Sequence, residues 1–161
     1  MALARILVDG YSLLHHWPEL APGRPRHSEF ARNELVHVLT RFFDATGTPI
    51  TVVFDGTGTG RPTPPTGPEP VIEILFSRAG QTADQMIERA AHRLAAYGEI
   101  LVVTNDTAER DTVEAMGAQS SSCANFIRLV ENALTELQDD LRTHNRAERN
   151  RFHRNPRREL K

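Results

Sequence analysis

The sequence predicts an α/β fold with a mostly parallel central sheet. Short apolar runs alternate along the chain with longer segments in which apolar residues recur at helical spacing. Strands that alternate with helices are joined by crossovers, which place neighbouring strands parallel. The length of 161 residues suits one domain with a substantial core.

The expected strands are short apolar runs that stop at turn residues. The first ends at Asp9-Gly10 and the second at Asp55-Gly56, and both dipeptides favour turns. Residues 57–70, between the second and third runs, are rich in Gly, Pro and Thr and are expected to form an exposed loop. The five expected strands are residues 4–8, 50–54, 71–76, 100–104 and 117–120.

The expected helices are marked by capping residues and by an apolar face. Ser28 begins the first and Ser122 the last, and Thr82 with Gln85 forms the pattern of a capping box. Residues 10–23 are expected to form a loop. The expected helices are residues 28–45, 82–97, 107–116 and 122–141.

Composition favours a cytoplasmic protein without a membrane anchor. No apolar run approaches the roughly 20 residues of a membrane span, and no secretory signal pattern begins the chain. The single cysteine, Cys123, cannot form a disulfide within the chain, which suits a reducing compartment.

The charge is distributed unevenly. Residues 142–161 carry eight Lys or Arg and two Glu, a net charge of +6, and because the whole chain carries −2, residues 1–141 carry −8. The sequence thus predicts a domain over residues 1–141 that holds cations, and a basic, flexible tail over residues 142–161 that contacts a polyanion. A merely solvated terminus is the alternative.

Four aspartates are expected to converge at one edge of the sheet. Asp9, Asp55 and Asp106 each follow a strand, and Asp84 lies in the first turn of the helix opened by Thr82. The carboxyl ends of parallel strands lie at the same edge, where α/β proteins bind ligands. Taken singly, each acid has an ordinary alternative role as a turn residue, a helix-dipole partner or an N-cap.

A cation at this cluster explains how four neighbouring carboxylates can all be ionised. Like charges a few ångströms apart raise one another's pKa, and a cation removes this repulsion. Oxygen ligands alone favour a hard metal ion, Mg²⁺ or Mn²⁺, bound singly or as a pair. Such an ion can activate water and stabilise the charge that develops on a phosphodiester.

The residues around these aspartates form four blocks: Ile6-Leu7-Val8-Asp9-Gly10-Tyr11-Ser12, Val53-Phe54-Asp55-Gly56, Phe76-Ser77 with Gln81-Thr82-Ala83-Asp84, and Val103-Thr104-Asn105-Asp106. In order and spacing, over about residues 5–130, the blocks resemble the YacP-like branch of the NYN domains, which are PIN-like ribonucleases. The resemblance implies a three-layer α/β/α PIN-like fold, a divalent cation and endonucleolytic cleavage of RNA.

The resemblance also implies roles for individual residues. Asp9, Asp84 and Asp106 correspond to metal ligands, and together with Asp55 as a supporting acid they form the implied catalytic group. Asp111 lies within reach in the sequence as a further supporting acid.

Ser12 departs from the family pattern, which usually has Asn after Asp-Gly-Tyr. A serine hydroxyl can orient a water or a phosphate, but it lacks the paired donor and acceptor of an amide. The substitution is therefore compatible with retained, weakened or lost catalysis. Asn105 lies at the end of another strand, so it is a supporting candidate and is not assumed to replace the Asn that the family has at the position of Ser12.

Basic and aromatic residues that follow the first aspartate are candidates for RNA contact. His15 and Trp17 could stack on unpaired bases, and Arg24, Arg26 and Arg32 could bind phosphates. The alternatives are a loop that packs Trp17 against the domain edge and an ordinary exposed position for Arg32.

We therefore expect an endoribonuclease that uses Mg²⁺ or Mn²⁺ to cleave mRNA or another single-stranded RNA, either free or on the ribosome. A second hypothesis is an RNA-binding module of the same fold that has lost turnover, as Ser12 allows. A third, a small-molecule phosphatase, is disfavoured because Tyr11 stands where the Asp-x-Asp pair of haloacid-type phosphatases has its second acid.

Overall fold

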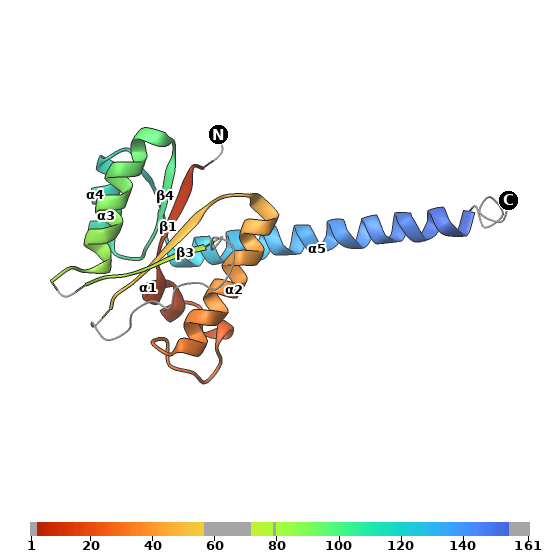
Figure 1. Ribbon diagram of the computed structural model, residues 1–161, viewed down its shortest axis with the longest axis horizontal. Coiled ribbons are helices and arrows are strands. Elements are labelled where there is room, and N and C mark those ends of the chain that lie inside the picture. Colours follow the sequence, from red (N-terminus) through yellow and green to blue (C-terminus); the bar gives the residue numbers. More distant parts are fainter. Residues whose placement is uncertain (1–2, 57–71, 79, 155–161) are drawn as a thin grey trace.

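The protein is built around a parallel sheet, which the computed structural model shows at the centre of the molecule (Figure 1). The structure describes residues 3–56, 72–78 and 80–154, so the expected loop at residues 57–70 lies outside the described residues. All neighbouring strands pair in parallel, in the order β3-β2-β1-β4-β5, which confirms the expected mostly parallel sheet. The strands are β1 (Arg5–Asp9), β2 (Ile50–Phe54), β3 (Ile72–Phe76), β4 (Ile100–Val103) and β5 (Gln119–Ser121).

Helices cover both faces of this sheet. Because successive residues of a strand point to opposite faces, Ile6 and Val8 of β1 join the core beneath α2 and α5, whereas Leu7 packs beneath α3 and α4. These two cores make the molecule a three-layer α/β/α fold, as expected. The helices are α1 (Gly10–His15), α2 (Glu29–Thr46), α3 (Ala83–Leu94), α4 (Thr107–Ala115) and α5 (Cys123–Arg154), with short 3₁₀ helices η1 (Pro18–Leu20) and η2 (Ala95–Tyr97).

The expected helix starts are confirmed by their hydrogen bonds. The Ser28 hydroxyl accepts the Ala31 N–H at 3.2 Å at the start of α2. At the start of α3, the Thr82 hydroxyl accepts the Gln85 N–H while the Gln85 side chain accepts the Thr82 N–H, each at 3.1 Å. This reciprocal capping box satisfies two backbone donors that a helix start otherwise leaves unpaired.

The segment after β1 is helical, which corrects the expectation of a loop over residues 10–23. Asp9 caps α1 by accepting the Ser12 N–H at 3.3 Å, and Leu13 and Leu14 are buried against the core. α1 has six residues and η1 has three, so neither is long enough to show a recognisable hydrophobic period. The capping role of Asp9 places the start of a helix directly at the end of the central strand.

The last helix continues beyond the expected end near Leu141. α5 has 32 residues and reaches Arg154, so the boundary expected at residue 142 falls inside a helix. No Gly or Pro occurs between Cys123 and Arg154, and the next proline in the sequence is Pro156. Figure 1 shows the second half of α5 extending away from the sheet. No helix among the described residues combines the length and apolar character needed to cross a bilayer.

Candidate metal centre

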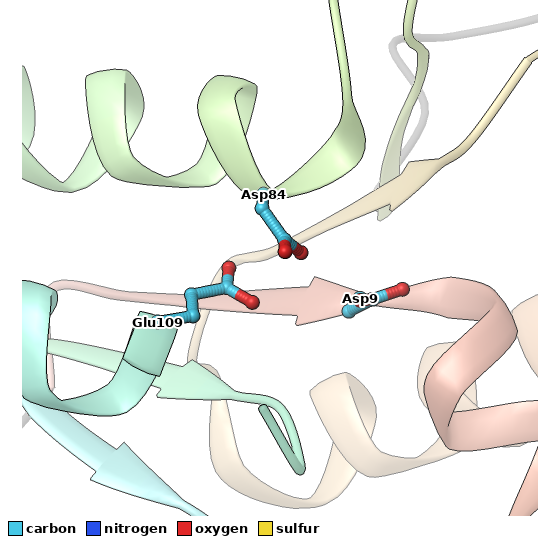
Figure 2. A group of neighbouring side chains, drawn as sticks. All are labelled: Asp9, Asp84 and Glu109. Carbon is cyan, nitrogen blue, oxygen red and sulfur yellow. The ribbon is translucent and has the colours of Figure 1, made fainter. Parts of the chain in front are cut away.

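Three carboxylates converge where β1 ends. Asp9, Asp84 and Glu109 each offer one carboxylate oxygen, and these oxygens lie within 4.8 Å of one another. Figure 2 shows Asp84 and Glu109 pointing toward one another, with Asp9 beside them at the end of its strand. The three residues come from β1, from the first turn of α3 and from the first turn of α4. The structure therefore brings together Asp9 and Asp84 as expected from the sequence, but with a different third acid.

Asp106 is not part of this group of three. Its carboxylate caps α4, accepting the N–H groups of Ala108 at 2.9 Å and Glu109 at 3.3 Å, and its side chain is exposed. Asp106 thus has the N-cap role that was the alternative for a strand-end acid, as Asp9 has at the start of α1. The first turn that Asp106 caps is the turn that carries Glu109 toward the other two acids. The third carboxylate within 4.8 Å is therefore Glu109 rather than Asp106, and a role of Asp106 as a metal ligand stays a prediction.

Glu109 is the residue that the sequence interpretation missed. Its side chain is 2% exposed, and neither carboxylate oxygen has a hydrogen-bond partner among the described residues. From the sequence, an acid in the first turn of a helix is an ordinary partner for the helix dipole. The available signal was its spacing from Val113, because residues four apart share a helix face and Val113 is buried. A buried carboxylate without a partner is costly, and a bound cation is one way to compensate it.

Burial and mutual repulsion change the proton affinity of this group. Burial, reinforced by the charges of Asp84, Asp55 and Asp106, raises the pKa of Asp9 to about 6, although the Ser12 N–H opposes the shift. Burial, followed by the neighbouring Asp84, raises the pKa of Glu109 to about 9. Glu109 is therefore the member of the group that holds a proton at neutral pH when no cation balances the charge.

The donor set fits a hard divalent cation. All three candidate ligands are carboxylates, without a nitrogen or sulfur ligand among them, and Mg²⁺ and Mn²⁺ favour such oxygen ligands. The unpartnered oxygens of Glu109 are available to bind an ion in place of a proton. The structure thus supports the expectation of a metal centre while leaving the identity of the ion open.

Asp55 contacts the element that carries Asp84. Its Oδ1 accepts the Ser77 hydroxyl at 2.9 Å and the Ala83 N–H at 3.1 Å. Because Ala83 is the first residue of α3, these bonds connect the end of β2 to the helix start next to Asp84. The arrangement suits a supporting acid that positions a ligand, which is the role expected for Asp55.

Of the other supporting candidates, Ser12 donates its N–H to Asp9, and both its hydroxyl and Asn105 contact Cys123. The Ser12 hydroxyl lies 3.5 Å from Cys123 Sγ. Asn105 accepts the Cys123 N–H at 2.8 Å, and its amide nitrogen lies 2.7 Å from His16 Nε2. These contacts join the loop after β4 to the end of α1 and to the start of α5. Asp111 is exposed on α4 and lies outside the group of three.

The residues expected to contact RNA differ in their exposure. His15, Arg24 and Arg26 are exposed, in agreement with a contact surface. Arg32 is half-buried and donates to the Tyr11 hydroxyl at 3.3 Å and to the His27 carbonyl at 2.7 Å. Trp17 is only 5% exposed and belongs to the core, which fits the alternative of a loop packed on the domain rather than an open stacking platform.

Comparisons with known proteins agree on one family. The sequence model of the YacP-like NYN domain matches residues 6–160. The uncharacterized protein YacP of Bacillus subtilis (strain 168) is 30% identical over 139 residues, covering 85% of this chain and 81% of the relative.

Solved structures of Rae1 (YacP) from Bacillus subtilis have the same fold as this chain. A mutant form superposes with a TM-score of 0.73 at 28% identity, covering 89% of this chain and 84% of the relative. A further crystal structure gives a TM-score of 0.72 at 25% identity, covering 99% and 91%. Both similarities extend over most of the three layers described above.

Proposed function

The chain belongs to the YacP-like NYN domain family, and on this premise we propose that it is a metal-dependent endoribonuclease. The membership supports an RNase-like domain. The observation that carries the proposal is the convergence of Asp9, Asp84 and Glu109 within 4.8 Å. Three carboxylates in such a group are suited to a divalent cation and to the cleavage of a phosphodiester.

Each residue near the centre has a proposed task. Asp9, Asp84 and Glu109 would hold the ion, and Asp55 would keep Asp84 in place through the Ala83 N–H. A bound Mg²⁺ or Mn²⁺ supplies electrostatic stabilisation of the phosphate charge and makes a water easier to deprotonate. With its oxygens committed to an ion, Glu109 no longer needs the proton that burial otherwise favours.

The proposed substrate is single-stranded RNA, such as mRNA, whether free or on the ribosome, in the cytoplasm. Exposed Arg24 and Arg26 follow α1, the helix that starts at Asp9, and they can bind phosphates close to the carboxylates. Exposed Arg142, Arg146 and Arg149 on α5 can bind phosphates farther along the strand. Phosphate contacts of this kind weaken as the salt concentration rises.

The direct test is cleavage of a labelled, mixed-sequence single-stranded RNA with Mn²⁺ or Mg²⁺, with EDTA as the metal-free condition. Asp84→Asn keeps the side-chain shape and removes one charge, so we expect a folded protein whose cleavage rate falls at least about 100-fold, typical of the loss of a metal ligand or its support. Asp44→Asn is the matched control, because Asp44 is exposed near the far end of α2. Cleavage that persists in EDTA or in Asp84→Asn would contradict the proposal.

The second candidate is an RNA-binding module without turnover, and the position of Ser12 favours it. The Ser12 hydroxyl contacts Cys123 Sγ, so it contributes packing rather than a ligand for the carboxylate group. This hypothesis predicts salt-dependent RNA binding with no cleavage under any metal condition. In that case Ser12→Asn is the variant to test for restored cleavage, because it returns the amide usual in the family.

A further inference from the structure

A cavity of about 560 Å³ lies at the end of α1 that is farther from Asp9. Its volume falls within the range of small-molecule sites in proteins. It opens between the end of α1, η1, the following loop and the start of α2. The lining residues that carry the argument are Leu14, Trp17, Ala21, His15, Arg24 and Arg26.

The inner wall of the cavity is apolar and belongs to the core. Leu14 is 4% exposed, Trp17 5% and Ala21 8%, and all three pack in the cluster beneath α2. Leu14 belongs to α1, and Trp17 and Ala21 are the two capping residues of η1, so these short helices after β1 fix the position of the wall. Too little of Trp17 is exposed for an open stacking platform, but the exposed parts of these core side chains form a preformed apolar wall that a flat ring can contact.

The rim of the cavity carries two arginines, Arg24 and Arg26, and one acid, Glu19. Arg26 contacts His15 Nδ1 and donates to His27 Nε2 at 3.3 Å, so its partners are imidazoles. The Arg24 guanidinium lies 4.9 Å from the centre of the Phe30 ring. Within the described chain, neither arginine has a carboxylate oxygen within 4.0 Å. Two uncompensated guanidinium groups at the mouth of an apolar cavity favour an anion that carries an apolar ring.

The cavity and the carboxylates are at opposite ends of α1. Asp9 caps the start of this helix and His15 is its last residue, so six residues and about 9 Å of helical rise separate the two. Figure 1 shows α1 leading from the end of β1 toward the loop that precedes α2. This separation along the helix is on the order of two to three nucleotides of a stacked strand.

We propose that this cavity binds one unpaired base of the RNA strand, with Arg24 and Arg26 holding the adjoining phosphate. The inference rests on the proposed function and deepens it, because it assigns the chain a base-binding subsite next to the cleavage centre. A base provides the flat apolar face that the Leu14–Trp17–Ala21 wall accepts, and its nucleotide provides the negative charge that the rim accepts. Glu19, also in the lining, is an acceptor for an exocyclic amino group of the base.

Trp17 provides a local readout, because it is the only tryptophan of the chain. The protein in EDTA is titrated with a single-stranded RNA hexamer, and with inorganic polyphosphate of matched charge as the probe for charge alone. We expect the hexamer to change Trp17 fluorescence saturably, and polyphosphate to leave it unchanged at the same concentration. EDTA prevents metal-dependent cleavage, so the signal reports binding only.

Two kinds of variant test whether the cavity is responsible. Arg26→Ala removes an exposed rim charge without touching the core, and we expect binding to weaken about tenfold, the effect of losing a charge-assisted contact. Ala21→Leu fills the cavity, and we expect the fluorescence response to be lost while thermal unfolding shows an intact fold. Arg41→Ala, an exposed position near the other end of α2, should bind as the wild type does.

The outcomes separate this inference from the proposed nuclease activity. An equal response to polyphosphate, or a response unaffected by both Arg26→Ala and Ala21→Leu, would overturn the base subsite even if the protein cleaves RNA. A hexamer response that needs both positions would support the subsite even if no metal condition gives cleavage. Asp84→Asn should leave the response intact, because Asp84 does not line the cavity.

Discussion

At the scale of single residues, Glu109 determines how the metal-free centre behaves. Its buried carboxylate has no hydrogen-bond partner among the described residues, and burial with Asp84 raises its pKa to about 9. A neutral, protonated Glu109 is therefore the form that the metal-free protein holds at neutral pH. Binding a cation requires the ionised form, so the same side chain opposes folding without metal and supports it with metal.

Glu109→Gln should separate these two effects. Gln is neutral and similar in shape, so we expect the variant to be at least as stable as the wild type in EDTA at pH 8. Saturating Mn²⁺ should raise the melting temperature of the wild type by about 5–10 °C, as a ligand at about 100 times its Kd does in a chain of this size. The variant should lose most of this increase.

The measurement is thermal unfolding with and without Mn²⁺, and Glu131→Gln on the exposed face of α5 is the matched control. A full Mn²⁺ response in Glu109→Gln would show that Glu109 does not bind the ion.

The raised pKa values also predict how stability depends on pH. In the folded protein the pKa of Asp9 is about 6 and that of Glu109 about 9, against ordinary values of 3.8 and 4.5. The folded state therefore binds more protons than the unfolded state between these limits, so stability falls as pH rises from about 4 to about 6 for Asp9 and from about 4.5 to about 9 for Glu109. In EDTA, we expect the melting temperature to fall by about 10–20 °C between pH 5 and pH 8.5, the effect of about 5 kcal/mol in a chain of this size, because each extra bound proton is worth about 1.4 kcal/mol per pH unit.

The Mn²⁺ response should follow the opposite trend, because protons compete with the ion. It should be larger at pH 8.5 than at pH 5, and Glu109→Gln should show a flatter pH profile in EDTA. A melting temperature that rises with pH in EDTA would contradict the proton uptake assigned to Asp9 and Glu109.

At the scale of elements, the start of α3 connects the fold to the centre. Asp55 accepts the Ala83 N–H and the Ser77 hydroxyl, and Asp84 is the next residue of the helix. Asp55→Ala removes both bonds, so we expect a stability loss of about 1–2 kcal/mol and a several-fold weaker Mn²⁺ affinity. Calorimetric titration of Mn²⁺ measures the second effect directly.

Thr82→Ala distinguishes positioning from simple weakening of α3. It removes a side-chain cap and should cost about 1 kcal/mol, but it leaves the Asp55–Ala83 bond in place. We therefore expect a similar stability loss with nearly normal Mn²⁺ affinity. Equal losses of affinity in both variants would argue that Asp55 acts only by stabilising the helix.

The length of an element decides whether it could be predicted from the sequence. The strands were predictable because continuous apolar runs such as Ile50–Phe54 lie between two helical layers, and the capped starts of α2 and α3 were predictable from Ser28 and Thr82. α1 and η1 were missed because each is shorter than the window over which a hydrophobic period is recognisable. Glu109 was missed because its spacing from Val113 indicates only a shared helix face. Its burial depends on how α4 packs against the sheet, which the sequence of α4 alone does not predict.

At the scale of the whole molecule, the long C-terminal helix departs most from the expected domain plan. Charge composition indicated a basic segment after Leu141, and α5 carries the exposed Arg142, Arg146 and Arg149 on a continuous helix. A polar helix surrounded by water gains little from tertiary packing, so composition alone predicted a tail. Contact between RNA and these three arginines of α5 stays a prediction.

From the length of α5, we expect its exposed arginines to set a minimum length of RNA for full binding. The helix starts at Cys123, whose sulfur lies 3.5 Å from the Ser12 hydroxyl beside the centre, and Arg142 follows 19 residues later. At 1.5 Å per residue this is about 28 Å, or about eight nucleotides of a stacked strand. Replacing Arg142, Arg146 and Arg149 by Ala should therefore reduce the salt dependence of binding for a 20-nucleotide RNA and leave a hexamer unaffected. Short fragments would then dissociate readily once cut, whereas long RNAs would be held for further rounds of cleavage.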